Sequence, residues 1–142
     1  MTSPARWPRD LPVARVRVAR PTGRLTEVVA FYRDAIGLPQ VAHFADHAGY
    51  DGVILGMPDA GYQLEFTSHV DEGPCPPPSD DNLLVLYFDS RAALEVVNQR
   101  CRDTGSAPVA ASNPYWTLID AVTFEDPDGW RVVLAPIPRN DT

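Results

Sequence analysis

The side chains of this sequence that could take part in catalysis or metal binding lie mainly in its first half. All three histidines, His43, His47 and His69, precede residue 70. His47 lies in a turn beside Gly49, where an imidazole could serve as an acid, a base or a ligand contact. The simpler interpretation is a solvent-exposed turn histidine. A metal site made from His47 and Glu65 would lack a third protein ligand.

A carboxylate and an arginine on two predicted strands offer a different chemistry. Residues 13–20 alternate in polarity, which predicts a strand with Arg17 on its polar face. Residues 62–68 predict a second strand, with Gln63 and Glu65 on the face opposite its apolar side chains. If burial raises its pKa, Glu65 can act as a general base. Most buried carboxylates, however, are simply paired.

An aromatic pair in a predicted loop is a further candidate for ligand contact. Pro114 fixes the backbone before Tyr115 and Trp116, and two large rings are rarely left in water without a partner. We expect them to stack on a planar ligand or to cap a pocket. The alternative is that Trp116 closes the core or a dimer interface. Residues 126–129 predict a tight turn without a catalytic role.

The elements that position these side chains occur twice in the same order. The first half predicts a strand at 13–20, a helix from Thr22 to Gly37, and strands at 40–45, 50–57 and 62–68, with turns at 46–49 and 58–61. The second predicts a strand at 83–88, a helix from Ser90 to Gly105, and strands at 108–111, 118–124 and 131–135. We expect half-modules 13–69 and 82–136, joined by a proline-rich linker at 70–81, in one domain spanning 1–142. The fold class is α+β, with two tandem βαβββ modules forming a curved mixed sheet around a central cleft and helices outside.

Three segments follow one another in a set order and spacing. They are Phe-Tyr-Arg-Asp-Ala-Ile-Gly-Leu at 31–38, Tyr-Gln-Leu-Glu-Phe at 62–66 and Asp-Pro-Asp-Gly-Trp-Arg-Val-Val-Leu at 126–134. Together with the duplication they resemble the vicinal-oxygen-chelate superfamily of glyoxalases, extradiol dioxygenases and bleomycin-resistance proteins. The Asn-Pro-Tyr-Trp segment at 113–116 further resembles a poorly characterised glyoxalase-like subgroup.

Metal-dependent members of that superfamily hold a divalent ion with four side chains, usually two His and two Glu. The resemblance places Arg17, Glu65, Asn82 and Val133 at the four positions. Only Glu65 is of a suitable type, because arginine has no free lone pair at neutral pH, valine has no donor and asparagine is a weak one. We therefore expect no metal at this site and no cofactor, although a divalent metal held by other residues is not excluded.

The resemblance implies a cleft in which Arg17 replaces the metal as the positive charge, with Glu65 as its partner; a purely structural ion pair is the equal alternative. The candidate ligand-binding residues are Arg17, His47, Gln63, Glu65, Asn82, Tyr115 and Trp116, with Leu84, Leu86 and Val133 as an apolar wall. The expected function is metal-free binding of a small molecule, in sequestration or resistance. The alternatives are a lyase, isomerase or dioxygenase-like enzyme with Glu65 as base, and a structural or regulatory dimer. Glu65 paired with Arg17 in an open cleft favours binding, and an unpaired Glu65 with a raised pKa favours catalysis.

Composition narrows the expected partners and location. The formal net charge of −7, with no lysine among the basic residues, argues against nucleic-acid binding. No apolar run approaches the roughly 18 residues of a membrane helix, and the N-terminus lacks the apolar stretch of a signal peptide. We expect a cytoplasmic protein with Cys75 and Cys101 as free thiols. The resemblance also implies a homodimer.

Overall fold

The strands in the first half of the chain form a four-stranded mixed sheet, here called the N-sheet. In the computed structural model, which describes residues 7–57 and 61–138, its strands are β1 (Val16–Pro21), β2 (Gln40–His47), β3 (Tyr50–Met57) and β4 (Tyr62–His69). The order is β1-β4-β3-β2, with β1 parallel to β4 and the other pairs antiparallel. The expectations for the N-terminus at 1–6 and for the turn residues 58–60 lie outside the described residues.

The helix predicted between β1 and β2 forms in two parts. Helix α1 (Leu25–Ala30) continues into the π-helix η1 (Phe31–Ile36), which ends at Gly37 with a φ of 101°. A side chain at Gly37 would be strained at this φ, and its Cβ would lie only 2.6 Å from a guanidinium nitrogen of Arg100. The glycine therefore both stops the helix, as predicted, and lets the second module approach closely.

The second half forms a three-stranded sheet, here called the C-sheet, with a long helix beside it. Its elements are β5 (Leu83–Phe88), α2 (Arg91–Asp103), α3 (Pro114–Leu118), β6 (Val122–Glu125) and β7 (Arg131–Pro136). The strand order is β5-β7-β6. The Ser90 hydroxyl accepts a hydrogen bond from the Ala93 amide at 3.1 Å, which caps α2 as expected.

Two predicted strands of the second half were wrong in extent. Residues 108–111 contribute only an isolated bridge between Val109 and Thr123. The strand predicted at 118–124 begins at Val122, because the chain before it turns into the short helix α3. The Asn113 side chain caps α3 by accepting a hydrogen bond from the Tyr115 amide at 3.0 Å, and a proline suits the first helical turn.

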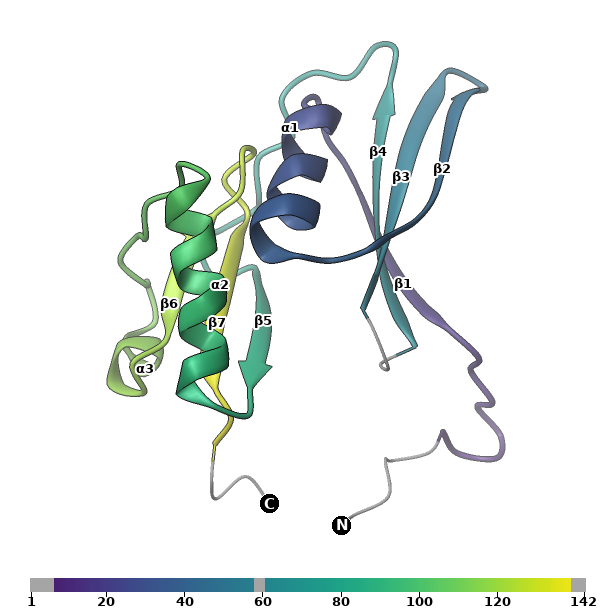
Figure 1. The fold of residues 1–142 in the computed structure, drawn as a ribbon. Coiled ribbons are helices and arrows are strands. Elements are labelled where there is room, and N and C mark those ends of the chain that lie inside the picture. The colour runs from purple at the N-terminus through teal and green to yellow at the C-terminus, as the bar shows by residue number, and fades with distance from the viewer. Residues whose placement is uncertain (1–6, 58–60, 139–142) are drawn as a thin grey trace.

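The buried core is shared by the two modules. It lies between the helices and the sheets and joins apolar side chains of α1, η1 and the N-sheet to those of α2 and the C-sheet (Figure 1). Arg100 of α2 strengthens this junction by donating hydrogen bonds to the carbonyl oxygens of Ala35 and Ile36 at 2.8 and 2.6 Å. The predicted α+β fold of two tandem modules is thereby confirmed, with one sheet in each module.

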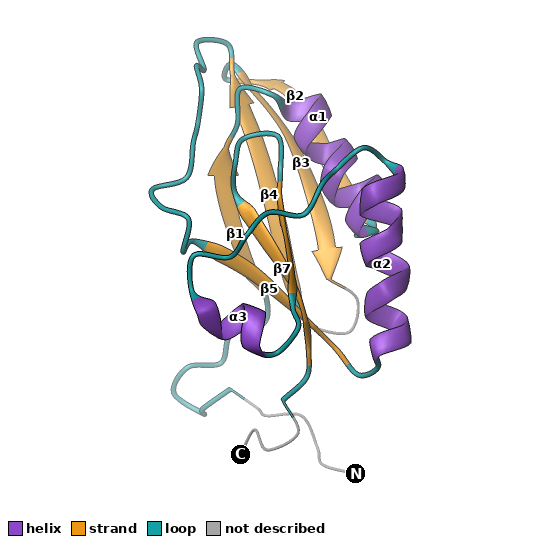
Figure 2. Ribbon diagram, turned by 90° about the vertical axis from the view of Figure 1, so that its left-hand side faces the viewer, coloured by secondary structure: helices purple, strands orange, loops and turns teal. Residues whose placement is uncertain are grey.

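The two sheets differ in how their faces are covered. Figure 2 shows α2 and α3 on opposite sides of the C-sheet, whereas α1 covers one side of the N-sheet. Leu84 and Leu86 pack into the core on the α2 side with their partners in β7, and the register puts Val133 on the opposite side. The predicted apolar wall of Leu84, Leu86 and Val133 is therefore wrong, because side chains alternate along a strand.

Candidate functional site

Arg17, Gln63 and Glu65 meet on the face of the N-sheet that α1 leaves uncovered. The Arg17 Nε and Nη2 atoms both donate to the Gln63 Oε1 at 3.0 and 2.9 Å. Its Nη1 donates to the Glu65 Oε1 at 3.2 Å. The parallel register of β1 and β4 explains the contact, because Arg17 pairs with Gln63 and Ala19 pairs with Glu65. We call these three residues the arginine cluster.

The surface beside the arginine cluster is apolar. Two glycines of β3, Gly52 and Gly56, take the places of side chains on this face, and β2 fills the space above them. A Cβ at Gly52 would overlap the Phe44 ring, and one at Gly56 would lie 2.9 Å from Val41. Phe44 and Val41 therefore lie across β3, and Val41 is 52% exposed. The open face thus combines a charged polar cluster with exposed apolar area.

The charges of the cluster remain in contact with solvent. The Arg17 and Glu65 side chains keep 37% and 18% of their surface exposed. Gln63 and Glu65 hold three of the five guanidinium N–H groups in position, so the planar donor group is oriented before a ligand arrives. Such an arrangement can hydrogen-bond a carbonyl, carboxylate or phosphonate oxygen.

The four positions implied by the superfamily do not fit a divalent metal. Arg17 presents only donors, and it directs one of them at Glu65, the one carboxylate of the set. The Asn82 Oδ1 accepts a hydrogen bond from the Ser79 hydroxyl at 2.8 Å. Val133 has no donor atom. Within residues 7–57 and 61–138 no three His, Cys, Asp or Glu side chains gather as a ligand group.

The pairing of β5 with β7 assigns one of these four positions to a different residue. In the C-sheet Val133 pairs with Val85, just as Glu65 pairs with Ala19 in the N-sheet. The residue two positions earlier in β5 is Leu83, which corresponds to Arg17. Asn82 was therefore placed one residue too early, and its side chain instead lines a cavity on the other face of the N-sheet.

Trp116, which belongs to α3, lies on the side of the C-sheet that faces away from α2 and not at the mouth of the Arg17 site. Trp116 lines a small hollow there together with Leu83, Thr123, Arg131 and Val133. The indole N–H is buried without a hydrogen-bond partner in the described part of the chain. Tyr115 contacts Trp116 edge-on at 5.1 Å and stays 43% exposed. Of the two interpretations of this pair, the packing one describes Trp116.

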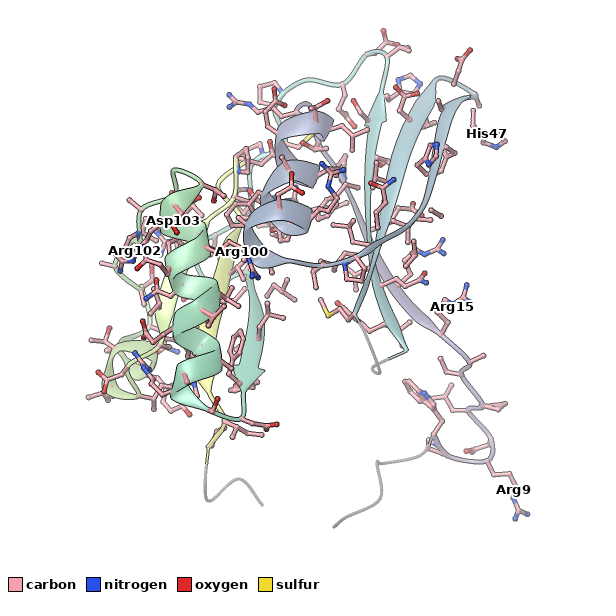
Figure 3. All side chains as sticks on the ribbon, in the orientation of Figure 1. Arg9, Arg15, His47, Arg100, Arg102 and Asp103 are labelled. Atoms are coloured by element: carbon pink, nitrogen blue, oxygen red, sulfur yellow. The ribbon has the colours of Figure 1, made fainter. Side chains whose placement is uncertain are left out.

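His47 lies apart from the arginine cluster. It is at the end of β2, paired with Tyr50, and Figure 3 shows it at the tip of the β2–β3 hairpin. The register sets it four residues along from Glu65, which is about 13 Å, and two strands across, which is about 10 Å. The structure thus brings Arg17, Gln63 and Glu65 together and leaves His47 at an exposed hairpin end.

A second charged group, which the sequence did not predict, joins the two modules. The Arg20 guanidinium forms ion pairs with Asp126 and, at 3.0 Å, with Asp128. The Asp126 carboxylate is fully buried and also accepts a hydrogen bond from the Tyr32 hydroxyl at 2.7 Å. Burial raises the pKa of Asp126, although the positive charge of Arg20 opposes this shift. Burial and the Asp126 charge together raise the pKa of Tyr32 well above its ordinary value.

Aromatic rings enclose the same guanidinium. The carbon at the centre of the Arg20 guanidinium lies 4.9 Å from the Phe66 ring centre and 5.0 Å from that of Trp130. The sequence did contain a signal for this buried ion pair, because Arg20 lies on the same face of β1 as the apolar residues Val16 and Val18. An arginine on the apolar face of a strand requires a buried anion, and the turn at 126–129 supplies it.

The chain shares its fold with solved structures described as glyoxalases and as a fosfomycin resistance protein, as the resemblance to the vicinal-oxygen-chelate superfamily implied. Residues 16–67 match the YycE-like N-terminal domain and residues 81–136 match the YycE-like C-terminal domain. The chain is 42% identical over 121 residues to the uncharacterised protein YycE of Bacillus subtilis (strain 168), covering 85% of this chain and 86% of that protein. It therefore belongs to the YycE-like family.

Solved structures agree with this assignment. The crystal structure of a YycE protein of unknown function from Bacillus subtilis matches with a TM-score of 0.84 at 40% identity, over 92% of this chain and 94% of that one. Glyoxalase I of Leishmania major matches at 0.65 and 15% identity, over 85% and 84%. TnmS3, an antibiotic-binding protein from Streptomyces sp. CB03234, matches at 0.64 and 18% identity, over 89% and 98%. These last two show a common fold.

Proposed function

We propose that this protein binds a small organic molecule on the open face of the N-sheet without the help of a metal, in sequestration or resistance. The observation that carries the proposal is the pairing of Arg17 with Glu65 and Gln63 beside exposed apolar surface. The ligand class is a partly aromatic molecule with an oxygen acceptor for the remaining Arg17 donors. The structural neighbour TnmS3, described as antibiotic-binding, supports a binding role, and the neighbour glyoxalase I keeps the enzyme alternative open to test.

A second copy of the chain is proposed to provide the opposite wall of the site. The arginine cluster lies on an open sheet face, and the Trp116 side of this chain's C-sheet is already occupied by α3. A homodimer would cover the exposed Val41 and shield the ion pair from water, which strengthens the interaction of Arg17 with a ligand.

Among the described residues, no helix is long and apolar enough to cross a membrane. The free thiols of Cys75 and Cys101 support a cytoplasmic location.

The proposal is tested by calorimetric titration of the purified protein with bleomycin, fosfomycin and benzoate. We expect at least one of them to bind, and Arg17→Met to weaken that binding by about tenfold or more, because a charge-assisted hydrogen bond is lost. Arg15→Met is the matched control, since Arg15 is an exposed arginine two residues earlier (Figure 3).

Two results would contradict the proposal. Equal binding by the Arg17→Met and Arg15→Met variants would remove the arginine cluster from the site. Conversion of the ligand by the wild type, followed by mass spectrometry and absent from Glu65→Gln, would establish the enzyme alternative with Glu65 as base.

A further inference from the structure

The opposite side of the N-sheet holds a cavity that is separate from the arginine cluster. Side chains alternate along β1 and β4, so Val18 and Leu64 point to the side opposite Arg17 and Glu65. A cavity of about 180 Å³ lies there, between the two modules. The N-sheet contributes Val18, Tyr62 and Leu64 to its lining, and the second module contributes Asn82, Leu84 and Trp130. Val18 is 50% exposed, which leaves the cavity open to solvent at that residue.

The size and lining of the cavity suit a single aromatic ring. An apolar cavity of about 150 Å³ is large enough to hold benzene. The walls here are mainly aliphatic and aromatic, and the Trp130 indole offers one flat surface. A ring of this kind can therefore exchange water contact for contact with Val18, Leu64 and Leu84.

The charges around the cavity are already balanced, which selects against ionic ligands. Arg20 borders the cavity, but it is paired with Asp126 and Asp128 and lies between two rings. Arg131 also borders it and is paired with Asp80 at 3.6 Å and Glu125 at 3.2 Å. Each arginine thus faces two carboxylates, so an anion entering the cavity would lose its water without gaining an unpaired cation.

Asn82, one of the residues that line the cavity, carries the amide that could give polar selectivity. The Asn82 oxygen is taken by the Ser79 hydroxyl, so the amide group is held in place while its nitrogen donates no hydrogen bond within the described residues. A ligand with one carbonyl or ether oxygen could accept that N–H. We propose that the cavity between the modules is a second binding site, for a neutral single-ring aromatic molecule carrying one hydrogen-bond acceptor.

Acetophenone is the probe, with toluene as its counterpart without the acceptor and benzoate as its anionic counterpart. The measurement is a chemical-shift titration of the Trp130 indole N–H in ¹⁵N-labelled protein, assigned with Trp130→Phe. For nine non-hydrogen atoms we expect an acetophenone Kd of about 1 mM. Benzoate should bind this site at least about tenfold more weakly.

Two exposed valines provide a matched pair of variants. Val18→Trp fills the cavity and should weaken acetophenone binding by about tenfold or more. Val41→Trp adds the same ring on the other side of the sheet and should leave acetophenone binding unchanged, because Val41 has nearly the same exposure but lines the open face. Arg17→Met should also leave it unchanged, which separates this site from the proposed function.

Asn82→Ala keeps the test valid if Val18→Trp does not fold. It should weaken acetophenone about fivefold and leave toluene unchanged, because only acetophenone uses the amide. Absence of an acetophenone effect on the Trp130 signal in the wild type would overturn the proposal. So would unchanged affinity in a folded Val18→Trp variant, or equal weakening of both ligands by Asn82→Ala.

Discussion

Replacing Asp126 by alanine removes the anion that links the two modules. The Asp126 carboxylate accepts hydrogen bonds from the Tyr32 hydroxyl and from the backbone amides of Asp128 and Trp130, at 2.7, 2.8 and 3.0 Å, in addition to the Arg20 ion pair. Breaking a buried pair by removing one partner costs about 3–5 kcal/mol, and here Arg20 stays buried with Asp128 as its remaining partner. Since domains of this size are stable by about 5–15 kcal/mol, we expect Asp126→Ala to lose a large part of the stability.

Asp128→Ala is the matched control for this prediction. Asp128 belongs to the same turn and contacts the same guanidinium, but its side chain makes a single contact with Arg20, at 3.0 Å. Arg20 keeps Asp126 in this variant, so we expect a cost of about 1–2 kcal/mol. The assay is urea unfolding at pH 7, followed by far-UV circular dichroism and tryptophan fluorescence. A cost below about 1 kcal/mol for Asp126→Ala, or equal costs for both variants, would refute the reasoning.

Three other predictions concern the junction and the metal question. Tyr32→Phe should cost about 1.5–3 kcal/mol at pH 7, since a hydrogen bond to the Asp126 charge is lost. The folded pKa of Tyr32 lies above 10.0, so the stability advantage of the wild type is full below pH 10 and falls above pH 10, where Tyr32 of the unfolded chain ionises. Urea unfolding at pH 9 to 11 measures this loss. Arg100→Ala should cost about 1–3 kcal/mol in the same assay, since the carbonyl of Ile36 loses its donor. Adding nickel, zinc or manganese should leave the thermal unfolding midpoint unchanged in both the wild type and Glu65→Gln, and a shift present only in the wild type would contradict the donor-set argument.

The parts of the fold that could be predicted are those with a short-range signal. Alternating side chains identified strands such as β4, and Gly37 marked a helix end because its φ demands a glycine. The helical turn at Pro114 was missed because its signal, an asparagine cap before a proline, is equally typical of a loop. The facing of Leu84 was missed because a fully apolar strand has no alternation to reveal which side is buried.

The candidate site was predicted in part for the same reason. Arg17, Gln63 and Glu65 lie on two strands whose polarity alternates, so their common face could be inferred once the strands were paired. The Arg20–Asp126 pair spans 106 residues of sequence, and no local pattern reports a contact over that separation. Trp116 could be recognised as a ring that needs a partner, but which surface it covers depends on the packing of α3.

Because α3 covers one side of the C-sheet, the structure bears on how many ligands bind for each chain and on how ligand binding is coupled to dimerisation. The duplicated module does not give the chain a second copy of the Arg17 surface, because Trp116 occupies the corresponding face. A ligand on the arginine cluster is enclosed, in the proposed homodimer, by a surface of the partner chain. In the proposed homodimer, ligand binding and chain association become thermodynamically coupled, so the apparent affinity rises with protein concentration and two ligands bind for each dimer.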